Sequence, residues 1–237
     1  MQRTRAKGRI STYYELTKPK IWYLLVFTAF GATITASNVY NVEVSAATWA
    51  LMLFGVAAGS AAANTLTNYH DRDIDAIMDR TKGRPIPSGR ISPPEKARDF
   101  GLALAGISLA CAFGISFTSG FWNGIWAGIF MAFGLVNNVA VYSHALKRRS
   151  RTNIILGGFC GGAPPLIGHV AVTMQGMWDL GMVMAGLVFI WIPMHIWALT
   201  LHFKEDYNKV NVPMLTAVQS EKTSARIIAI STLVMVL

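Results

Sequence analysis

The chain has 237 residues, of which 53% are hydrophobic and 14% charged, and its formal net charge is +9. The 21 Lys and Arg residues lie in four short segments between apolar blocks, which leaves no compact basic domain of the kind that binds nucleic acid. We therefore predict an all-α protein of the polytopic membrane type, with the lipid bilayer as its surroundings and no nucleic-acid partner.

Six apolar blocks have the length of about 20 residues that an α-helix needs to cross a bilayer. They cover residues 21–37, 46–66, 99–118, 121–142, 153–173 and 178–202. A seventh apolar segment begins after Arg226 and is too short to cross by Leu237. The blocks predict a helix bundle that forms one membrane domain over residues 1–237, and we expect further C-terminal spans beyond it.

The basic segments predict the orientation of the bundle. Lys and Arg are confined to the N-terminal arm (residues 1–20) and to residues 69–98, 143–152 and 203–226. The connections around 38–45, 118–121 and 174–179 contain neither. By the positive-inside rule, the N-terminus and the basic loops face the cytoplasm, and we expect the protein in the plasma (inner) membrane.

The segment after the second block is unusually rich in both signs of charge. Residues 68–90 read NYHDRDIDAIMDRTKGRPIPSGR, with four Asp and five basic residues. We expect the preceding helix to continue to about Met78, before Gly83, Pro85 and Pro87. At 100° per residue, one face about 80° wide would then carry Asn64, Asn68, Asp71, Asp75 and Asp79, while Asp73 points elsewhere.

Two interpretations of this carboxylate face remain open. In the first, the acids are neutralised in a solvated loop by the basic residues around them, which are Arg72, Arg80, Lys82 and Arg84. In the second, the carboxylates hold Mg²⁺, which binds a few carboxylates together with substrate phosphates. Arg80 and Arg84 would then bind phosphate oxygens. Carboxylates and cations together are what a metal-bridged pyrophosphate site requires.

Two further polar segments are predicted on the same cytoplasmic face. Lys204, Glu205, Asp206 and Tyr207 follow the last full block, so Asp206 is a candidate for a second acidic wall of one polar cavity. The run KRRSR (147–151) offers Lys147 and Arg148 as ligands for phosphate or propionate groups. Membrane topology alone also explains a basic loop at this position.

Four segments, in the same order along the chain, resemble the UbiA superfamily of intramembrane prenyltransferases, and within it most closely the protoheme IX farnesyltransferases (haem O synthases). They are ELTKPKIWYLLVFTAFGA (15–32), DRDIDAIMDRTKGRPIPSG (71–89), LKRRSRTNIILGGFCGGAPPLIG (146–168) and PMHIWALTLHFKEDYNKVNVPML (193–215). The sequence departs from the family at Thr67, where members commonly have Asn, and Asn64 lies one turn back. It also has Lys209 and Val210 where quinone-type relatives carry the second of two Asp residues four positions apart.

The resemblance implies about nine membrane helices around a central cavity, with Mg²⁺-dependent transfer of a farnesyl group from farnesyl diphosphate to a vinyl group of haem B. The implied catalytic residues are Asn68, Asp71, Asp75, Asp206 and His195, of which the first four are candidate metal ligands. His195 follows Pro193 inside the last full block and matches a histidine of the haem branch, so it is a candidate for haem contact. The candidate substrate-binding residues are Asn64, Arg80, Arg84, Lys147, Arg148, Lys204 and Tyr207.

Other functions remain as alternatives. The same diphosphate chemistry would serve a quinone precursor or a lipid alcohol as acceptor, and a non-catalytic haem-binding protein belongs to a different class. Transport is disfavoured, because transporters place ionisable sites near the membrane midplane and the acidic residues here gather at one face.

Overall fold

The structure is a computed structural model that describes residues 8–236, so residues 1–7 of the predicted N-terminal arm lie outside the described part. The described residues form helices and connecting turns, without a strand, which confirms the all-α prediction. The helices are α1 (Arg9–Leu16), α2 (Pro19–Tyr40), α3 (Ala46–His70), α4 (Arg72–Ile77), α5 (Glu95–Gly114), η1 (Ile115–Phe117), α6 (Phe121–Val136), η2 (Asn137–Leu146), α7 (Asn153–Gly158), η3 (Phe159–Gly162), α8 (Ala163–Val170), η4 (Met177–Gly181), α9 (Met182–His202), α10 (Lys204–Lys209), α11 (Leu215–Val218) and α12 (Glu221–Val236).

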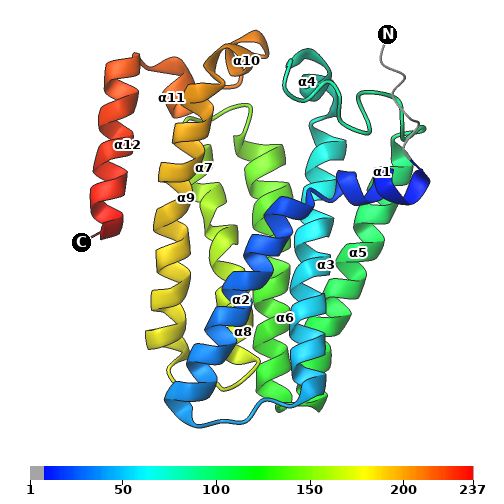
Figure 1. The fold of residues 1–237 in the computed structure, drawn as a ribbon, viewed down its shortest axis with the longest axis vertical. Helices are drawn as coiled ribbons and strands as arrows, with labels where there is room; N and C mark the ends of the chain where they lie inside the picture. The colour runs from blue at the N-terminus through cyan, green and yellow to red at the C-terminus, as the bar shows by residue number, and fades with distance from the viewer. Residues whose placement is uncertain (1–7, 237) are drawn as a thin grey trace.

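The long helices run roughly parallel along the height of the molecule, while α1 lies across them near one end (Figure 1). The short helices α4, α10 and α11 gather at this same end, and the connection between α2 and α3 lies at the other. We call the first of these the loop end. All four basic segments of the sequence that fall within the described residues lie toward it.

Five helical segments within the described residues are long and apolar enough to cross a membrane: Pro19–Tyr40, Ala46–His70, Glu95–Phe117, Phe121–Leu146 and Met177–His202. Each contains most of one predicted apolar block. The remaining block, residues 153–173, forms α7, η3 and α8 one after another, so it does not make a single regular helix. Its sequence GGFCGGAPP supplies the reason, because glycines weaken a helix and prolines remove backbone donors.

Small residues in this broken segment allow neighbouring helices to approach closely. A Cβ atom at Gly168 of α8 would lie 2.2 Å from the carbonyl oxygen of Ala29 in α2. Thr33 of α2 donates a hydrogen bond of 2.9 Å to the Gly168 carbonyl across the same contact. Close backbone approach and interhelical hydrogen bonds of this kind hold helices together in lipid.

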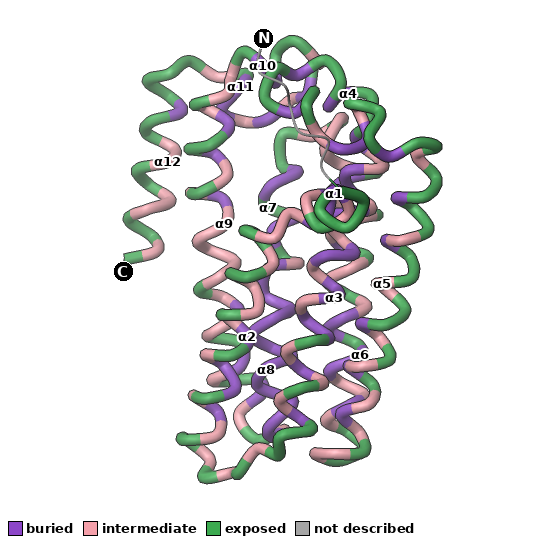
Figure 2. Tube along the Cα trace, turned by 45° about the vertical axis from the view of Figure 1, so that its right-hand side comes forward, coloured by how far each residue is buried: buried purple, intermediate pink, exposed green. Residues whose placement is uncertain are grey.

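Buried residues concentrate along the interior of the bundle, and exposed residues lie on the outward parts of the helices (Figure 2). The main apolar core includes Ala29, Val56, Ala127 and Ile167, which come from four different helices. Large apolar side chains such as Phe27 (68% exposed) and Phe54 (60% exposed) point outward. Apolar residues on both the inner and the outer faces fit a bundle surrounded by lipid.

The second predicted helix does not continue to Met78 without interruption. It ends at His70, Asp71 acts as the junction, and α4 resumes the helix as far as Ile77. The backbone amides of Asp71 and Asp75 still bond to the carbonyls four residues earlier, so these two carboxylates keep their one-turn spacing. Met78 is extended, with ψ of 127°. The prediction that Asp79 shares their face was therefore wrong.

The fourth membrane helix changes its winding near the loop end. Residues Asn137–Leu146 (η2) form a π-helix, and the amide of Lys147 bonds to the carbonyl of Tyr142, five residues back, at 2.8 Å. Such wide turns are rare, and they are common at functional sites. This one ends at the two basic residues that face α3 and α4.

Candidate functional site

Asp71 lies at the junction between α3 and α4 and is only 1% exposed. Its Oδ2 atom accepts a hydrogen bond from the ammonium of Lys147. Its Oδ1 atom is also buried and lies 4.0 Å from a guanidinium nitrogen of Arg148, and no described residue donates a hydrogen bond to it. A buried carboxylate oxygen without a donor is costly unless it binds another group, so this atom is free to coordinate a ligand.

Asp75, one turn further along, is 3% exposed and pairs with a different cation. Nη1 of Arg84 lies 2.6 Å from Oδ2 of Asp75 and 3.3 Å from Oδ1 of Asn68. The amide nitrogen of Asn68 donates to the Leu16 carbonyl at 2.8 Å, which ties α3 to the end of α1. The structure thus brings Asn68, Asp71 and Asp75 together, as the sequence predicted.

Lys18, at the junction between α1 and α2, joins this group and was not predicted as a site residue. Its backbone is left-handed, with φ of 53°, and Pro19 begins α2 directly after it. Burial is the main cause that lowers the pKa of the Lys18 ammonium to about 7, and the nearby positive charges of Arg84 and Lys147 lower it further. Among the described residues, its ammonium has no hydrogen-bond partner. The signal in the sequence was the basic TKPK segment directly before the first apolar block.

We call Lys18, Asp71, Asp75, Arg84 and Lys147 the charged centre. Three cations surround two carboxylates here, and all five side chains lie at the loop end of the bundle. The neutralising interpretation is partly confirmed, because Arg84 does pair with Asp75. However, the Lys18 ammonium has no partner and Oδ1 of Asp71 has no donor among residues 8–236, so within this part of the chain the charged centre has one free group of each sign.

Asp73 and Asp79 lie outside the charged centre. Both guanidinium Nη atoms of Arg148 contact the Asp73 carboxylate, at 2.6 and 2.7 Å, and this pairing lowers the pKa of Asp73 to about 2. Asp79 pairs with Lys209 and with Lys82, which lowers its pKa to about 2 as well. Both are exposed ion pairs of the kind that contribute little to stability.

The second polar segment meets the first, as predicted. The Asp206 carboxylate on α10 accepts hydrogen bonds of 3.1 Å from the backbone amides of both Asp79 and Arg80. The Arg80 guanidinium lies over the ring of Phe203, 4.9 Å from its centroid. Asp206 therefore holds the loop after α4 in place.

The other predicted residues of the second segment have local contacts. Lys204 donates to the Gln219 carbonyl at 2.7 Å, and Tyr207 is buried in an apolar cluster with Ile74 and Met214. These contacts give both side chains a place in the packing of α10 and α11.

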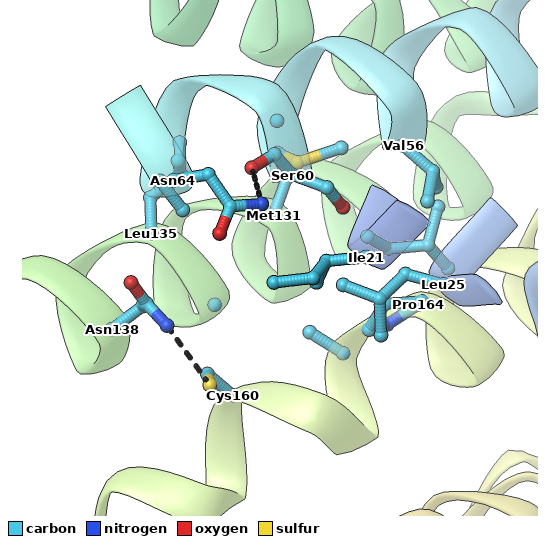
Figure 3. Close-up of a pocket in the computed structure, with 15 residues that line it drawn as sticks. Ile21, Leu25, Val56, Ser60, Asn64, Met131, Leu135, Asn138, Cys160 and Pro164 are labelled. Atoms are coloured by element: carbon cyan, nitrogen blue, oxygen red, sulfur yellow. Dashed lines mark hydrogen bonds between the residues drawn. The ribbon is translucent and has the colours of Figure 1, made fainter. Parts of the chain in front are cut away.

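An apolar cavity of about 530 Å³, counting its open mouth, lies inside the bundle next to the charged centre. Most of the side chains around it are apolar, such as Leu25, Val56 and Leu135, with Ser60, Asn64 and Asn138 as polar exceptions (Figure 3). Asn64 donates to the Ser60 carbonyl at 2.9 Å, and Asn138 donates to Cys160 at 3.5 Å. Asn64 lies one turn of α3 before Asn68, so the cavity adjoins the charged centre.

His195 lies on α9 away from both features. Its side chain is exposed, and its ring stacks on Trp191 with a centroid distance of 4.4 Å. It is not among the residues that line the cavity.

The charged centre has donors that suit Mg²⁺, although the described residues contain no cluster of three or more His, Cys, Asp or Glu side chains arranged to hold a metal ion. Asp71 offers a buried carboxylate oxygen without a partner, and Asp75 and Asn68 offer oxygens beside it. Mg²⁺ uses one or two carboxylates and takes its remaining oxygens from water and substrate phosphates. The donor set fits an ion that arrives with a phosphate-bearing substrate.

Comparison with known proteins agrees with this geometry. The model of the UbiA prenyltransferase family matches residues 24–237. Protoheme IX farnesyltransferase 2 of Cenarchaeum symbiosum is 68% identical over 237 residues, which is 100% of this chain and 76% of the relative. Protoheme IX farnesyltransferase of Thermoplasma volcanium is 41% identical over 228 residues, covering 96% of this chain and 76% of the relative.

Two solved structures share the fold. A digeranylgeranylglyceryl phosphate synthase superposes with a TM-score of 0.72 at 20% identity, covering 96% of this chain and 75% of that one. A UbiA homologue from Archaeoglobus fulgidus, bound to DMAPP and Mg²⁺, superposes with a TM-score of 0.70 at 17% identity over 95% of this chain and 75% of that one. With five apolar helices long enough to span a bilayer and a family model matched along most of its length, this chain belongs to the UbiA prenyltransferase family of integral membrane proteins.

Proposed function

We propose that the protein transfers a farnesyl group from farnesyl diphosphate to a vinyl group of haem B, with addition of water, to give the hydroxyethylfarnesyl side chain of haem O. The observation that carries the proposal is that the charged centre, whose Lys18 has no partner among the described residues, follows directly along α3 from an apolar cavity that Asn64 lines. The relative that is 68% identical over the whole chain is named a protoheme IX farnesyltransferase, which supports this acceptor.

The charged centre suits the diphosphate. Among the described residues Lys18 has no partner, and Arg84 and Lys147, whose charges act on it, each contact one carboxylate, so all three would be available to a diphosphate bound at the charged centre. Asn68, Asp71 and Asp75 would hold Mg²⁺, which supplies further positive charge to the leaving pyrophosphate. Positive groups fixed in advance stabilise the charge that develops on the leaving oxygen as the allylic C–O bond breaks.

The apolar cavity suits the isoprenoid chain. Its mostly apolar lining would disfavour water, which would otherwise capture the allylic cation before the vinyl carbon does. Because Asn64 lines the cavity one turn from Asn68, a chain inside it would have its diphosphate end at the charged centre. No strong protein nucleophile is needed for this reaction.

Acceptor binding is the remaining part of the proposal. His195 on α9 would contact haem, as an axial ligand or as the group that handles the added water. Asp206 would act as a second wall of the polar region, and the loop end would face the cytoplasm at the plasma membrane.

Product analysis tests the proposed function directly. Purified protein in membranes is given haem B or a quinone precursor, each with geranyl, farnesyl or geranylgeranyl diphosphate and Mg²⁺, and the products are identified by mass spectrometry. We expect the hydroxyethylfarnesyl haem from haem B as the main product, with farnesyl diphosphate preferred over the other two donors. Prenylation of the quinone precursor with haem left unchanged would replace the acceptor, and haem binding without any transfer would contradict catalysis.

A further inference from the structure

A second hollow at the loop end lies outside the charged centre. It is lined by His70, Arg72, Asp73, His144, Arg148 and Arg149, which come from the α3–α4 junction and from the end of η2 with the turn after it. We call this hollow the basic pocket. Arg148 lies between the two sites, because it pairs with Asp73 in the pocket while one of its nitrogens is 4.0 Å from Asp71.

The charges of the basic pocket do not cancel. The carboxylate of Asp73 is occupied by both Nη atoms of Arg148, which leaves two other arginines in the lining. Within the described residues, neither Arg72 nor Arg149 has a carboxylate within ion-pair distance. Arg72 donates to the Tyr69 carbonyl at 2.8 Å and lies over the Tyr69 ring, so its guanidinium is held in position while its charge remains uncompensated.

Two imidazoles add further donors. The rings of His70 and His144 meet edge to face with their centroids 5.3 Å apart. In the described part of the chain, their ring nitrogens make no hydrogen bond to protein. Two guanidinium groups and two imidazoles from separate elements therefore converge on one hollow, and planar guanidinium groups match phosphate oxygens well.

The position of the basic pocket relative to the membrane indicates which phosphate-bearing molecule could reach it. His70 is the last residue of one membrane span and His144 lies in the last turn of another, so the pocket is at the level where a span meets water. Basic pockets between helices at this level bind anionic lipid head groups. The positive-inside rule requires only that basic residues lie on the cytoplasmic side. It does not require arginines from two separate elements to line the same pocket.

We propose that the basic pocket binds the phosphate group of an anionic phospholipid from the surrounding bilayer. Free phosphate in the aqueous phase carries the same chemistry and is the other source to be distinguished. The site uses Arg72, His144 and Arg149, none of which belongs to the charged centre, so the inference does not depend on the proposed transfer reaction.

The experiment measures retained lipid by native mass spectrometry. Protein purified in a neutral detergent, without divalent metal, is mixed with equal amounts of phosphatidylglycerol and phosphatidylcholine. Inorganic phosphate is titrated separately by calorimetry. The variants are Arg72→Gln/Arg149→Gln and His144→Gln/Arg149→Gln, with Arg149→Lys as the variant that keeps the charge. Arg151→Gln is the matched control, since Arg151 is exposed in the same turn and does not line the pocket.

We expect the wild-type protein, Arg149→Lys and Arg151→Gln to retain phosphatidylglycerol in preference to phosphatidylcholine. In both double variants the ratio of retained phosphatidylglycerol to phosphatidylcholine should fall about tenfold, because each variant removes charge-assisted bonds to phosphate. A second outcome is that the wild-type protein shows no lipid preference but binds inorganic phosphate in calorimetry, and that the double variants lose this binding. That result would support the basic pocket as a phosphate site whose ligand is free phosphate. The inference is overturned if the wild-type protein binds neither, or if Arg151→Gln loses as much as the double variants.

Discussion

The three aspartates of the DRDID segment differ in the side chains that their carboxylates contact. Asp71 and Asp75 are buried, and each contacts a cation of the charged centre, whereas Asp73 is exposed and pairs with Arg148. Sequence spacing predicted this division, because Asp73 falls on another face of the helix. Similar side chains within five residues therefore have different expected roles.

Exchanging Asp71 or Asp75 for Asn tests this division. We expect either variant to lower farnesyl transfer by about 10²–10³-fold, because each loses a charged ligand for the ion that neutralises the pyrophosphate. Asp73→Asn is the matched control and should stay within about threefold of wild type, since exposed ion pairs contribute little. Equal losses at all three positions, measured as haem O formed per minute, would contradict the division.

Lys18 should make diphosphate binding depend on pH. Its pKa of about 7 in the free protein leaves the amine mostly neutral at about pH 8. A bound diphosphate favours the charged form and raises this pKa, so binding should take up close to one proton. Because folding lowers the pKa from 10.5, the free energy of unfolding without ligand should also rise with pH between about 7 and 10.5.

Proton uptake is measured by calorimetry of diphosphate binding in two buffers with different ionisation enthalpies. Lys18→Gln should remove the uptake, and Lys20→Gln, which changes an exposed lysine two residues away, should keep it. An unchanged uptake in Lys18→Gln would show that another group takes up the proton.

At the scale of elements, α10 fixes the loop that follows α4. The Asp206 carboxylate accepts both the Asp79 and the Arg80 amides, so we expect Asp206→Ala to speed hydrogen exchange at residues 79–84 by about tenfold or more. Glu205→Ala, on the same helix, is the control. Normal exchange in Asp206→Ala, combined with weaker Mg²⁺-dependent diphosphate binding, would instead support Asp206 as a metal ligand.

The elements also show what the sequence alone predicts well. Long apolar runs predict membrane helices because lipid requires each span to satisfy its own backbone, and five runs match continuous helices. The break in residues 153–170 comes from glycines and prolines inside an otherwise apolar run, which hydrophobicity alone does not show. The wide turns of η2 have no such marker in the sequence. Lys18 was missed because Arg84, Lys147, Asp75 and Asp71, whose charges act on it, are far from it in the sequence.

At the scale of the whole molecule, the cavity should limit the length of the isoprenoid. Ala63 lines it, so we expect Ala63→Phe to lower the ratio of farnesyl to geranyl transfer by about tenfold, because the larger ring occupies space needed by the longer chain. Ala110→Phe adds the same volume at an exposed position of α5 and should leave the ratio unchanged. Product ratios by mass spectrometry decide this, and an unchanged ratio in Ala63→Phe would place the chain elsewhere.

The orientation of the bundle has its own test. A cysteine at Ser88, in the loop end, should react with a membrane-impermeant maleimide only in inverted vesicles, while a cysteine at Asn41 should react only in intact cells. Replacing Cys111 and Cys160 with Ala in both proteins removes the background. The reverse pattern of labelling would contradict the predicted cytoplasmic loop end.

The wide turns of η2 also decide which way the residues after them point. A π-helix has about 4.4 residues per turn instead of 3.6, so ten residues of it rotate about half a revolution less than the same ten in an α-helix. Lys147, directly after η2, reaches Asp71 from this rotated position. Rewinding the segment to regular α-helix would turn the ammonium away from the carboxylate without altering either side chain. The number of residues per turn in η2 therefore helps to decide whether Lys147 can contact the diphosphate. An insertion or deletion within residues 137–146 should reduce diphosphate binding as much as removing Lys147 does.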